Sequence, residues 1–141
     1  MLRFLITDDD EVTHAYLRHV LIGLGDVSHC FSGGEALDAC REALNAASPF
    51  DCVLMDVLMP GMTGLETMRG IKEQHQAAAL PAPKFVLISC LSEMACRLEA
   101  KAPCDADRYL VKPFGRRAIL TALAGLGFGP PPETQDGEET W

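Results

Sequence analysis

Long apolar runs, clusters of basic residues and paired cysteine motifs are all missing from this chain of 141 residues. No apolar stretch approaches the roughly 20 residues that a membrane helix needs, so we expect no contact with a membrane. The amino-terminal MLRFLITDDD has neither a basic segment nor a cleavage site, which argues against a secretory signal and favours the cytoplasm. The formal net charge is −8, and no cluster of Lys and Arg is present, which argues against a nucleic-acid partner.

Cysteine and histidine are present, but without the spacing of a disulfide framework or a metal site. The six cysteines form no CxxC motif, and we expect small buried hydrophobic residues in a reducing compartment (Cys30, Cys40, Cys52, Cys90, Cys96 and Cys104). The four histidines form no i, i+4 pair, and we expect them to be solvated or to lie on helix faces (His14, His19, His29 and His75). Neither residue type predicts a metal centre.

The composition that remains is that of one globular domain followed by a polar tail. Hydrophobic residues make up 48% of the chain and charged residues 23%, and the length suits a single core. From residue 127 the sequence changes to GFGPPPETQDGEETW, where three prolines stop a helix and four acidic residues supply half of the net charge. We therefore expect a domain over residues 1–127 and a flexible Pro-rich acidic tail over residues 128–141. A contact of Trp141 with a partner is a second interpretation of the tail.

Apolar runs and helical patterns alternate along the domain. Buried strands are predicted at Leu2–Thr7, Val27–Phe31, Cys52–Met55, Phe85–Ser89 and Tyr109–Val111. Five helices are expected between and after them, of which the segment at about 91–100 has the weakest pattern. Strands that alternate with crossover helices predict an α/β fold with a doubly wound parallel sheet.

Apolar stripes mark the faces of the predicted helices that we expect to be buried. The clearest stripe follows Gly33 (Ala36, Leu37, Cys40, Ala43 and Leu44). The first helix has a less regular stripe (Val12, Tyr16, Val20 and Leu24), and so does the last (Ala118, Ile119, Ala122, Leu123 and Leu126).

Carboxylates follow two of the predicted strands. The first strand ends in Asp8, Asp9 and Asp10, and the strand CVLMD ends in Asp56. Because the carboxyl ends of parallel strands meet at one edge of the sheet, we expect these side chains to lie close together. Because like charges repel one another, we expect a cation to lie among these carboxylates. Carboxylate oxygens are ligands that Mg²⁺ prefers.

A hydroxyl and a lysine follow the other two strands of this edge. Ser89 ends the run FVLIS, and Lys112 lies in VKPF after the fifth strand. A carboxylate nucleophile, a metal ion, a hydroxyl and a lysine are the groups that phosphoryl transfer requires, because that reaction depends on positioning and charge stabilisation. The arrangement favours Asp56 as the acceptor of a phosphoryl group.

Together the motifs FLITDDD, VLMDVLMPGMTG, VLIS and YLVKPF resemble, in order, those of the receiver domain of two-component response regulators, over about residues 1–127. The resemblance implies a (βα)5 flavodoxin-like fold of the CheY type with strand order 2-1-3-4-5. It implies that Asp56 takes a phosphoryl group from a phosphohistidine on a sensor histidine kinase or a histidine phosphotransfer protein. Such a protein is a signalling module that catalyses its own phosphorylation and dephosphorylation, and not an enzyme acting on other substrates.

The same resemblance assigns roles to individual residues. Mg²⁺ would be held by Asp9, Asp56 and the backbone carbonyl of Leu58, with Asp8 acting largely through water. Ser89 and Tyr109 correspond to the switch residues that change the surface of the fourth helix, fifth strand and fifth helix. Lys112 would pair with the phosphoryl group, and the Lys112–Pro113 peptide bond is expected to be cis.

Several alternatives stay open at this point. The run DDDEVT also fits the first motif of haloacid-dehalogenase-type phosphatases, in which Asp8 would be the nucleophile and Asp10 the acid/base. A second alternative is a receiver that no longer accepts a phosphoryl group. Since no output segment follows residue 127, we expect a stand-alone receiver, monomeric or weakly dimeric. It would either act on a downstream protein target or pass the phosphoryl group on as a relay intermediate.

Overall fold

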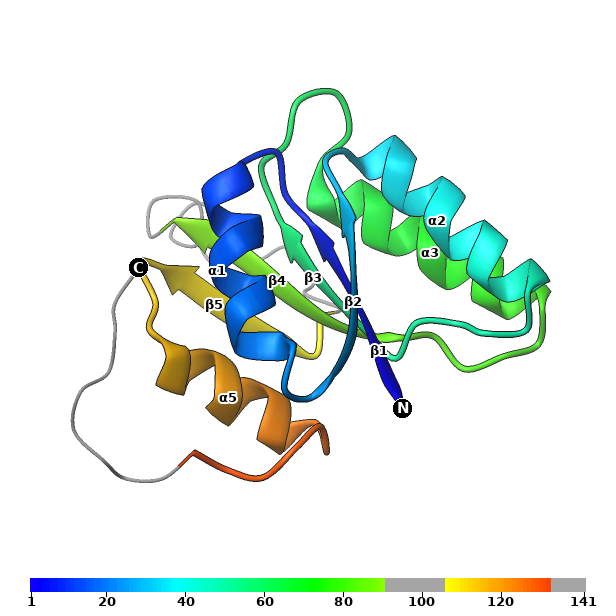
Figure 1. Ribbon diagram of the computed structural model, residues 1–141. Helices are drawn as coiled ribbons and strands as arrows, with labels where there is room; N and C mark the ends of the chain where they lie inside the picture. Colours follow the sequence, from blue (N-terminus) through cyan, green and yellow to red (C-terminus); the bar gives the residue numbers. More distant parts are fainter. Residues whose placement is uncertain (91–105, 133–141) are drawn as a thin grey trace.

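The computed structural model describes residues 1–90 and 106–132, which form five strands and four helices (Figure 1). In chain order these are β1 (Leu2–Thr7), α1 (Glu11–Leu21), β2 (Gly25–Cys30), α2 (Gly33–Asn45), β3 (Cys52–Asp56), α3 (Gly64–Ala77), β4 (Lys84–Cys90), β5 (Arg108–Lys112) and α5 (Arg116–Gly125). All neighbouring strands are parallel, and their order in the sheet is β2-β1-β3-β4-β5. The predicted flavodoxin-like sheet and its strand order are confirmed.

The sheet is covered on both faces, because successive residues of its inner strands point to opposite sides. In β3, Val53 and Met55 enter the core beneath α2 and α3, whereas Cys52 and Leu54 enter the core beneath α1 and α5. Figure 1 shows α2 and α3 side by side on one face and α1 and α5 on the other. Burial on both faces explains why these strands have continuous apolar sequences.

Side-chain caps fix the first residue of three helices. The side chains of Asp10, Ser32 and Thr63 accept hydrogen bonds from backbone N–H groups in the first turns of α1, α2 and α3. At α3 the Glu66 carboxylate also accepts from the backbone N–H of Thr63, which completes a capping box and lowers the pKa of Glu66. Each of these caps follows the carboxyl end of a strand, so the caps fix the loops that connect β1, β2 and β3 to the helices that follow them.

The face of α1 that is buried differs from the predicted stripe. Its buried residues are Thr13, His14, Leu17, Val20 and Leu21, whereas Val12 is 60% exposed. The prediction counted only apolar residues, and two polar side chains belong to the buried face. The weak helix predicted at about 91–100 lies outside the described residues.

Two of the four histidines, His14 and His75, lie on helix faces of α1 and α3, as one part of the prediction had it, but these faces are buried, so neither side chain is solvated. The Nδ1–H of His75 donates a 3.0 Å hydrogen bond to the carbonyl oxygen of Pro81, beyond the end of α3. The prediction for cysteine is confirmed at Cys30, Cys40 and Cys52, which are free and buried. Burial raises the pKa of Cys30 to about 11 and that of Cys40 to about 12, so both thiols are unreactive at neutral pH.

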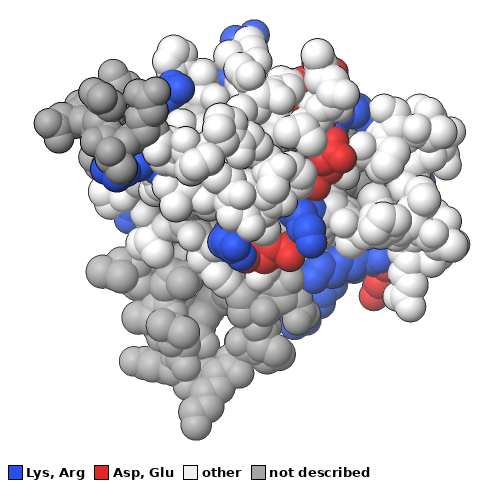
Figure 2. All heavy atoms as spheres, turned by 90° about the horizontal axis from the view of Figure 1, so that it is seen from below, with Lys and Arg blue, Asp and Glu red and all other residues white. Residues whose placement is uncertain are grey.

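Basic and acidic side chains are mixed on the face of the molecule that Figure 2 shows. Figure 2 shows Lys and Arg side chains next to Asp and Glu side chains on the underside of the molecule. Within the described residues, the structure contains no helix that is both long and apolar enough to cross a membrane.

Candidate functional site

Three carboxylates converge at the carboxyl edge of the sheet. Ligand oxygens of Asp8, Asp9 and Asp56 all lie within 4.8 Å of one another. Asp8 and Asp9 follow β1, and Asp56 is the last residue of the adjacent strand β3, so the parallel pairing of the two strands brings them together. Asp8 and Asp56 are buried and Asp9 is exposed, which leaves the cluster open to solvent on one side.

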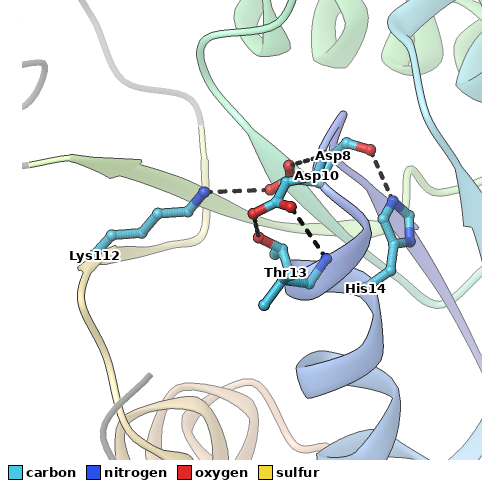
Figure 3. Close-up of polar contacts among 6 residues, drawn as sticks. Asp8, Asp10, Thr13, His14 and Lys112 are labelled. Atoms are coloured by element: carbon cyan, nitrogen blue, oxygen red, sulfur yellow. Dashed lines mark hydrogen bonds and ion pairs between the residues drawn. The ribbon is translucent and has the colours of Figure 1, made fainter.

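The environment of Asp8 disfavours its negative charge. Burial raises the pKa of the Asp8 carboxyl above its ordinary value, and the charge of Asp9 raises it further. Two contacts act in the opposite direction: the backbone N–H of Asp10 donates to Asp8 Oδ1 at 2.9 Å, and Lys112 Nζ lies 3.5 Å from Asp8 Oδ2 (Figure 3). The 3.5 Å contact is an ion pair that is too long for a good hydrogen bond. The effect of burial on the pKa is larger than that of these two contacts, so the negative charge of Asp8 is unfavourable in the folded protein.

We therefore expect Asp8→Asn to stabilise the protein when divalent ions are absent. The pKa of the Asp8 carboxyl is higher in the folded protein than in the unfolded chain. The protonated carboxyl therefore stabilises the folded state at low pH, and this stabilisation is lost as the pH rises through the raised pKa. At pH 7 the variant should have a melting temperature a few degrees above that of the wild type, and the difference should shrink in acid. Thermal denaturation between neutral and acidic pH, with and without Mg²⁺, measures this. A variant that melts below the wild type at pH 7 without Mg²⁺ would contradict the expectation.

Lys112 and Ser89 reach the same edge from the next two strands. Ser89 lies in β4, which pairs with β3, and Lys112 is the last residue of β5. The Ser89 hydroxyl is fully buried and makes no hydrogen bond to the described residues. A buried hydroxyl without a partner costs free energy, so this one is poised for an acceptor that enters the site.

The remaining predicted site residues occupy the surroundings of the cluster. Tyr109 is half-buried and packs against the core beneath α2 and α3. The side chain of Leu58 is 63% exposed just after β3. The peptide bond between Lys112 and Pro113 is cis. Asp10, the acid/base of the phosphatase alternative, caps α1: its Oδ1 accepts from the backbone N–H of Val12 at 3.1 Å.

The donor set of the cluster suits a small divalent cation. Three carboxylates within 4.8 Å of one another repel, and within the described residues Asp8 Oδ2 is buried with no hydrogen-bond partner and only the long ion pair to Lys112. Mg²⁺ prefers oxygen ligands of this kind, with water completing its shell. The residues present therefore fit the predicted metal ion.

Gly64 is a positioning residue that sequence reasoning did not single out. It begins α3, and its N–H donates to the carbonyl oxygen of Val57 at 2.8 Å. A Cβ atom at this position would overlap the backbone carbonyl oxygen of Asp56. Only glycine lets α3 approach the acidic cluster this closely. The final Gly of VLMDVLMPGMTG was the available signal, but the close approach is visible only in three dimensions.

We expect Gly64→Ala to displace Asp56 and to lower the free energy of unfolding by about 1–3 kcal/mol through overpacking. Chemical denaturation and Mg²⁺ titration of the folded variant would measure the two effects. Gly34→Ala is the matched control, because Gly34 also lies in the first turn of a helix and a Cβ there meets no atom within 4 Å. Gly34→Ala should be as stable as the wild type or slightly more so. Equal stability of the two variants would contradict the role of Gly64.

Residues 4–124 match the family of the response regulator receiver domain. The chain belongs to this family. Among curated relatives of the receiver domain is the sensory/regulatory protein RpfC of Xanthomonas campestris pv. campestris, which is 30% identical over 126 residues. The match covers 89% of the chain but only 16% of RpfC, so the receiver domain corresponds to a small part of that relative.

Solved receiver structures share the same fold. The chemotaxis response regulator CheY4 of Vibrio cholerae superimposes with a TM-score of 0.65 at 27% identity, covering 89% of this chain and 98% of CheY4. The receiver domain of the histidine kinase CKI1 of Arabidopsis thaliana, solved with Mg²⁺ and BeF3⁻, gives a TM-score of 0.61 at 27% identity. That match covers 79% of this chain and 80% of the CKI1 domain. Receiver domains thus bind Mg²⁺ at a pocket of this type, and the protein is a signalling module of two-component systems.

Proposed function

We propose that this receiver accepts a phosphoryl group on Asp56 from a phosphohistidine donor in a reaction that requires Mg²⁺. The observation that carries the proposal is the convergence of Asp8, Asp9 and Asp56 within 4.8 Å. Membership of the receiver family supports the choice of Asp56, which matches the acceptor position in VLMDVLMPGMTG.

The chemistry assigned to Asp56 is a displacement at phosphorus. A carboxylate oxygen of Asp56 forms a bond to the phosphorus atom, the bond from phosphorus to the donor imidazole nitrogen breaks, and the electron pair of that bond leaves with the nitrogen. Asp9, Asp56 and the carbonyl of Leu58 would hold Mg²⁺, with Asp8 contributing through water. The ion, when bound, supplies positive charge for the phosphoryl oxygens.

Lys112 and Ser89 complete the proposed site. In the receiver without a phosphoryl group, Lys112 is held near Asp8 by the 3.5 Å ion pair. A phosphoryl group on Asp56 would offer this ammonium a second anionic partner, and it would give the buried Ser89 hydroxyl an acceptor that it lacks. Both contacts favour the phosphorylated state and help to position it.

The signal would leave the site through Ser89 and Tyr109. Movement of the hydroxyl toward the phosphoryl group, with rotation of the tyrosine ring, would shift an existing equilibrium between two surface states. Tyr109 is half-buried in the present structure, next to Leu110 in β5. The affected surface would include β5 and α5, where a downstream protein target would bind.

The proposed unit comprises residues 1–127, with residues 128–141 as a tail, and its donor is a sensor histidine kinase or a histidine phosphotransfer protein. Phe128, the first residue of this tail, packs against the body, because its ring meets the Phe4 ring edge-to-face with centroids 6.1 Å apart. Transfer of label from the phosphorylated receiver to a histidine phosphotransfer protein would separate a relay intermediate from a direct effector.

The experiment that tests the proposal is phosphorylation by acetyl phosphate, with and without Mg²⁺. Because acetyl phosphate is a small chemical donor, the experiment can be done without identifying the cognate kinase. Mass spectrometry should find one added phosphoryl group on Asp56, formed only when Mg²⁺ is present. Absence of the modification under both conditions would mean that the receiver no longer takes a phosphoryl group.

A further inference from the structure

Two histidines meet edge to edge between α1 and β2, beside the acidic cluster but not part of it. The Nδ1 atoms of His14 and His29 lie 2.7 Å apart. His14 comes from the buried face of α1, and His29 comes from the outer strand β2, where its side chain is exposed. The two nitrogens therefore face each other, and the pair is reached from solvent on the His29 side.

Contacts on the far side of His14 fix its tautomer and its orientation. His14 Nε2 lies 2.7 Å from the backbone carbonyl oxygen of Asp8, which can only accept, so Nε2 carries the proton (Figure 3). The Phe31 ring stacks on the His14 ring with centroids 4.1 Å apart. In neutral His14 the Nδ1 lone pair is therefore presented to His29. An imidazole whose other N–H donates to a backbone carbonyl is the usual arrangement of a metal-binding histidine.

We propose that His14 and His29 form a site for a divalent transition-metal ion, bound by the two Nδ1 atoms in place of the proton they now share. With metal–nitrogen bonds of about 2.0 Å, neighbouring ligands of a square-planar ion lie about 2.8 Å apart and those of a tetrahedral ion about 3.3 Å apart. The observed 2.7 Å matches the square-planar separation, so the two nitrogens keep their spacing, while each ring turns until its lone pair points at the ion instead of at the other nitrogen. Cu²⁺ prefers that arrangement and binds nitrogen ligands most tightly among the divalent ions of its row, so it is the expected occupant.

The charges around the pair set its affinity. Burial lowers the pKa of His29, and the neighbouring His14 and Arg18 side chains lower it further, which favours the neutral imidazole that a metal ion requires. Arg18 repels a metal cation for the same reason that it repels a proton. Two protein ligands leave the other positions of the ion to water. Because His14 also holds the Asp8 carbonyl, an ion at this site would fix the backbone of the acidic cluster.

Titration of the whole protein with Cu²⁺ in millimolar Mg²⁺, followed by electron paramagnetic resonance, tests this site. One equivalent of Cu²⁺ should show hyperfine splitting from two nitrogen nuclei. Carboxylate oxygens give no such splitting, so binding at the acidic cluster is recognised separately, and a failure here leaves the proposed phosphoryl transfer untouched. His29→Gln should lose one nitrogen and bind Cu²⁺ at least about tenfold more weakly.

Two further variants control for general effects. His19→Gln removes an exposed histidine of the same helix and should leave binding and spectrum unchanged. Arg18→Gln removes the repelling charge and should tighten binding severalfold, an effect that a purely structural role of the pair does not predict. A spectrum without nitrogen splitting in the wild type, or a two-nitrogen spectrum that survives His29→Gln, would overturn the proposal.

Discussion

Asp56→Asn should abolish phosphorylation by acetyl phosphate, leaving the added phosphoryl group below about 1% of the wild-type amount. A side-chain amide cannot form the acyl phosphate that the carboxylate forms. The substitution keeps the size of the side chain, and it removes one negative charge from a cluster whose members lie within 4.8 Å of one another, so the variant should fold. Intact-mass measurement after incubation with acetyl phosphate and Mg²⁺ gives the result directly.

Asp38→Asn is the matched control for this experiment. Asp38 lies on α2 with its side chain 72% exposed and pairs with Arg41 at 3.2 Å, away from the acidic cluster. The control should be phosphorylated like the wild type. Modification that persists in Asp56→Asn would move the acceptor elsewhere, and dependence on Asp8 in that case would revive the phosphatase interpretation.

The second large effect is expected at Lys112. Lys112→Ala should lower the rate of phosphorylation by about 100-fold, because a fixed positive charge beside a transferring phosphoryl group stabilises its transition state. The same variant removes the ion pair to Asp8. The gain in melting temperature on adding Mg²⁺ should therefore be larger than in the wild type, since the ion then compensates a charge that has lost its basic neighbour.

Lys84→Ala separates this effect from the general loss of a lysine. Lys84 begins β4, is half-exposed and lies 3.9 Å from Asp107, so its removal should change the phosphorylation rate little. Lys112→Arg keeps the charge but changes its shape and should give an intermediate rate. A rate for Lys112→Ala within twofold of the wild type would show that Lys112 takes no part in the reaction.

The strands follow from the sequence because each inner strand is buried on both faces, whereas their order was implied by the resemblance of the motifs to receiver domains. The run CVLMD has no polar residue before its final Asp. An apolar run this short between two turns is typical of a buried strand, because a helix is usually at least about 10 residues long. Carboxyl ends of parallel strands share an edge, so the acidic cluster follows from the strand assignment. The sequence therefore predicts which carboxylates gather at this edge when they follow directly after an apolar run, as Asp8, Asp9 and Asp56 do.

Polar residues inside the fold were the part that the sequence could not reveal. The sequence predicts a solvated or helix-face position for His14 and does not show that this face is buried, where the Asp8 carbonyl, His29 and the Phe31 ring provide its partners. Those partners are separated from it along the chain and meet it only when β1 and β2 pair. Gly64 was overlooked for the same reason, since the atom that forbids a side chain there belongs to β3.

The strand order has a consequence for the motions of the site. Asp56 ends β3, which has a strand on each side, whereas Lys112 ends β5, which among the described strands pairs only with β4. Amide hydrogens of a central strand exchange with solvent mainly through global unfolding, and those of an outer strand also exchange through local opening. We therefore expect the proposed acceptor to lie in the slowest-exchanging part of the receiver and the lysine to lie on a strand that opens more readily. On this expectation, the site combines a fixed carboxylate with a more mobile cation.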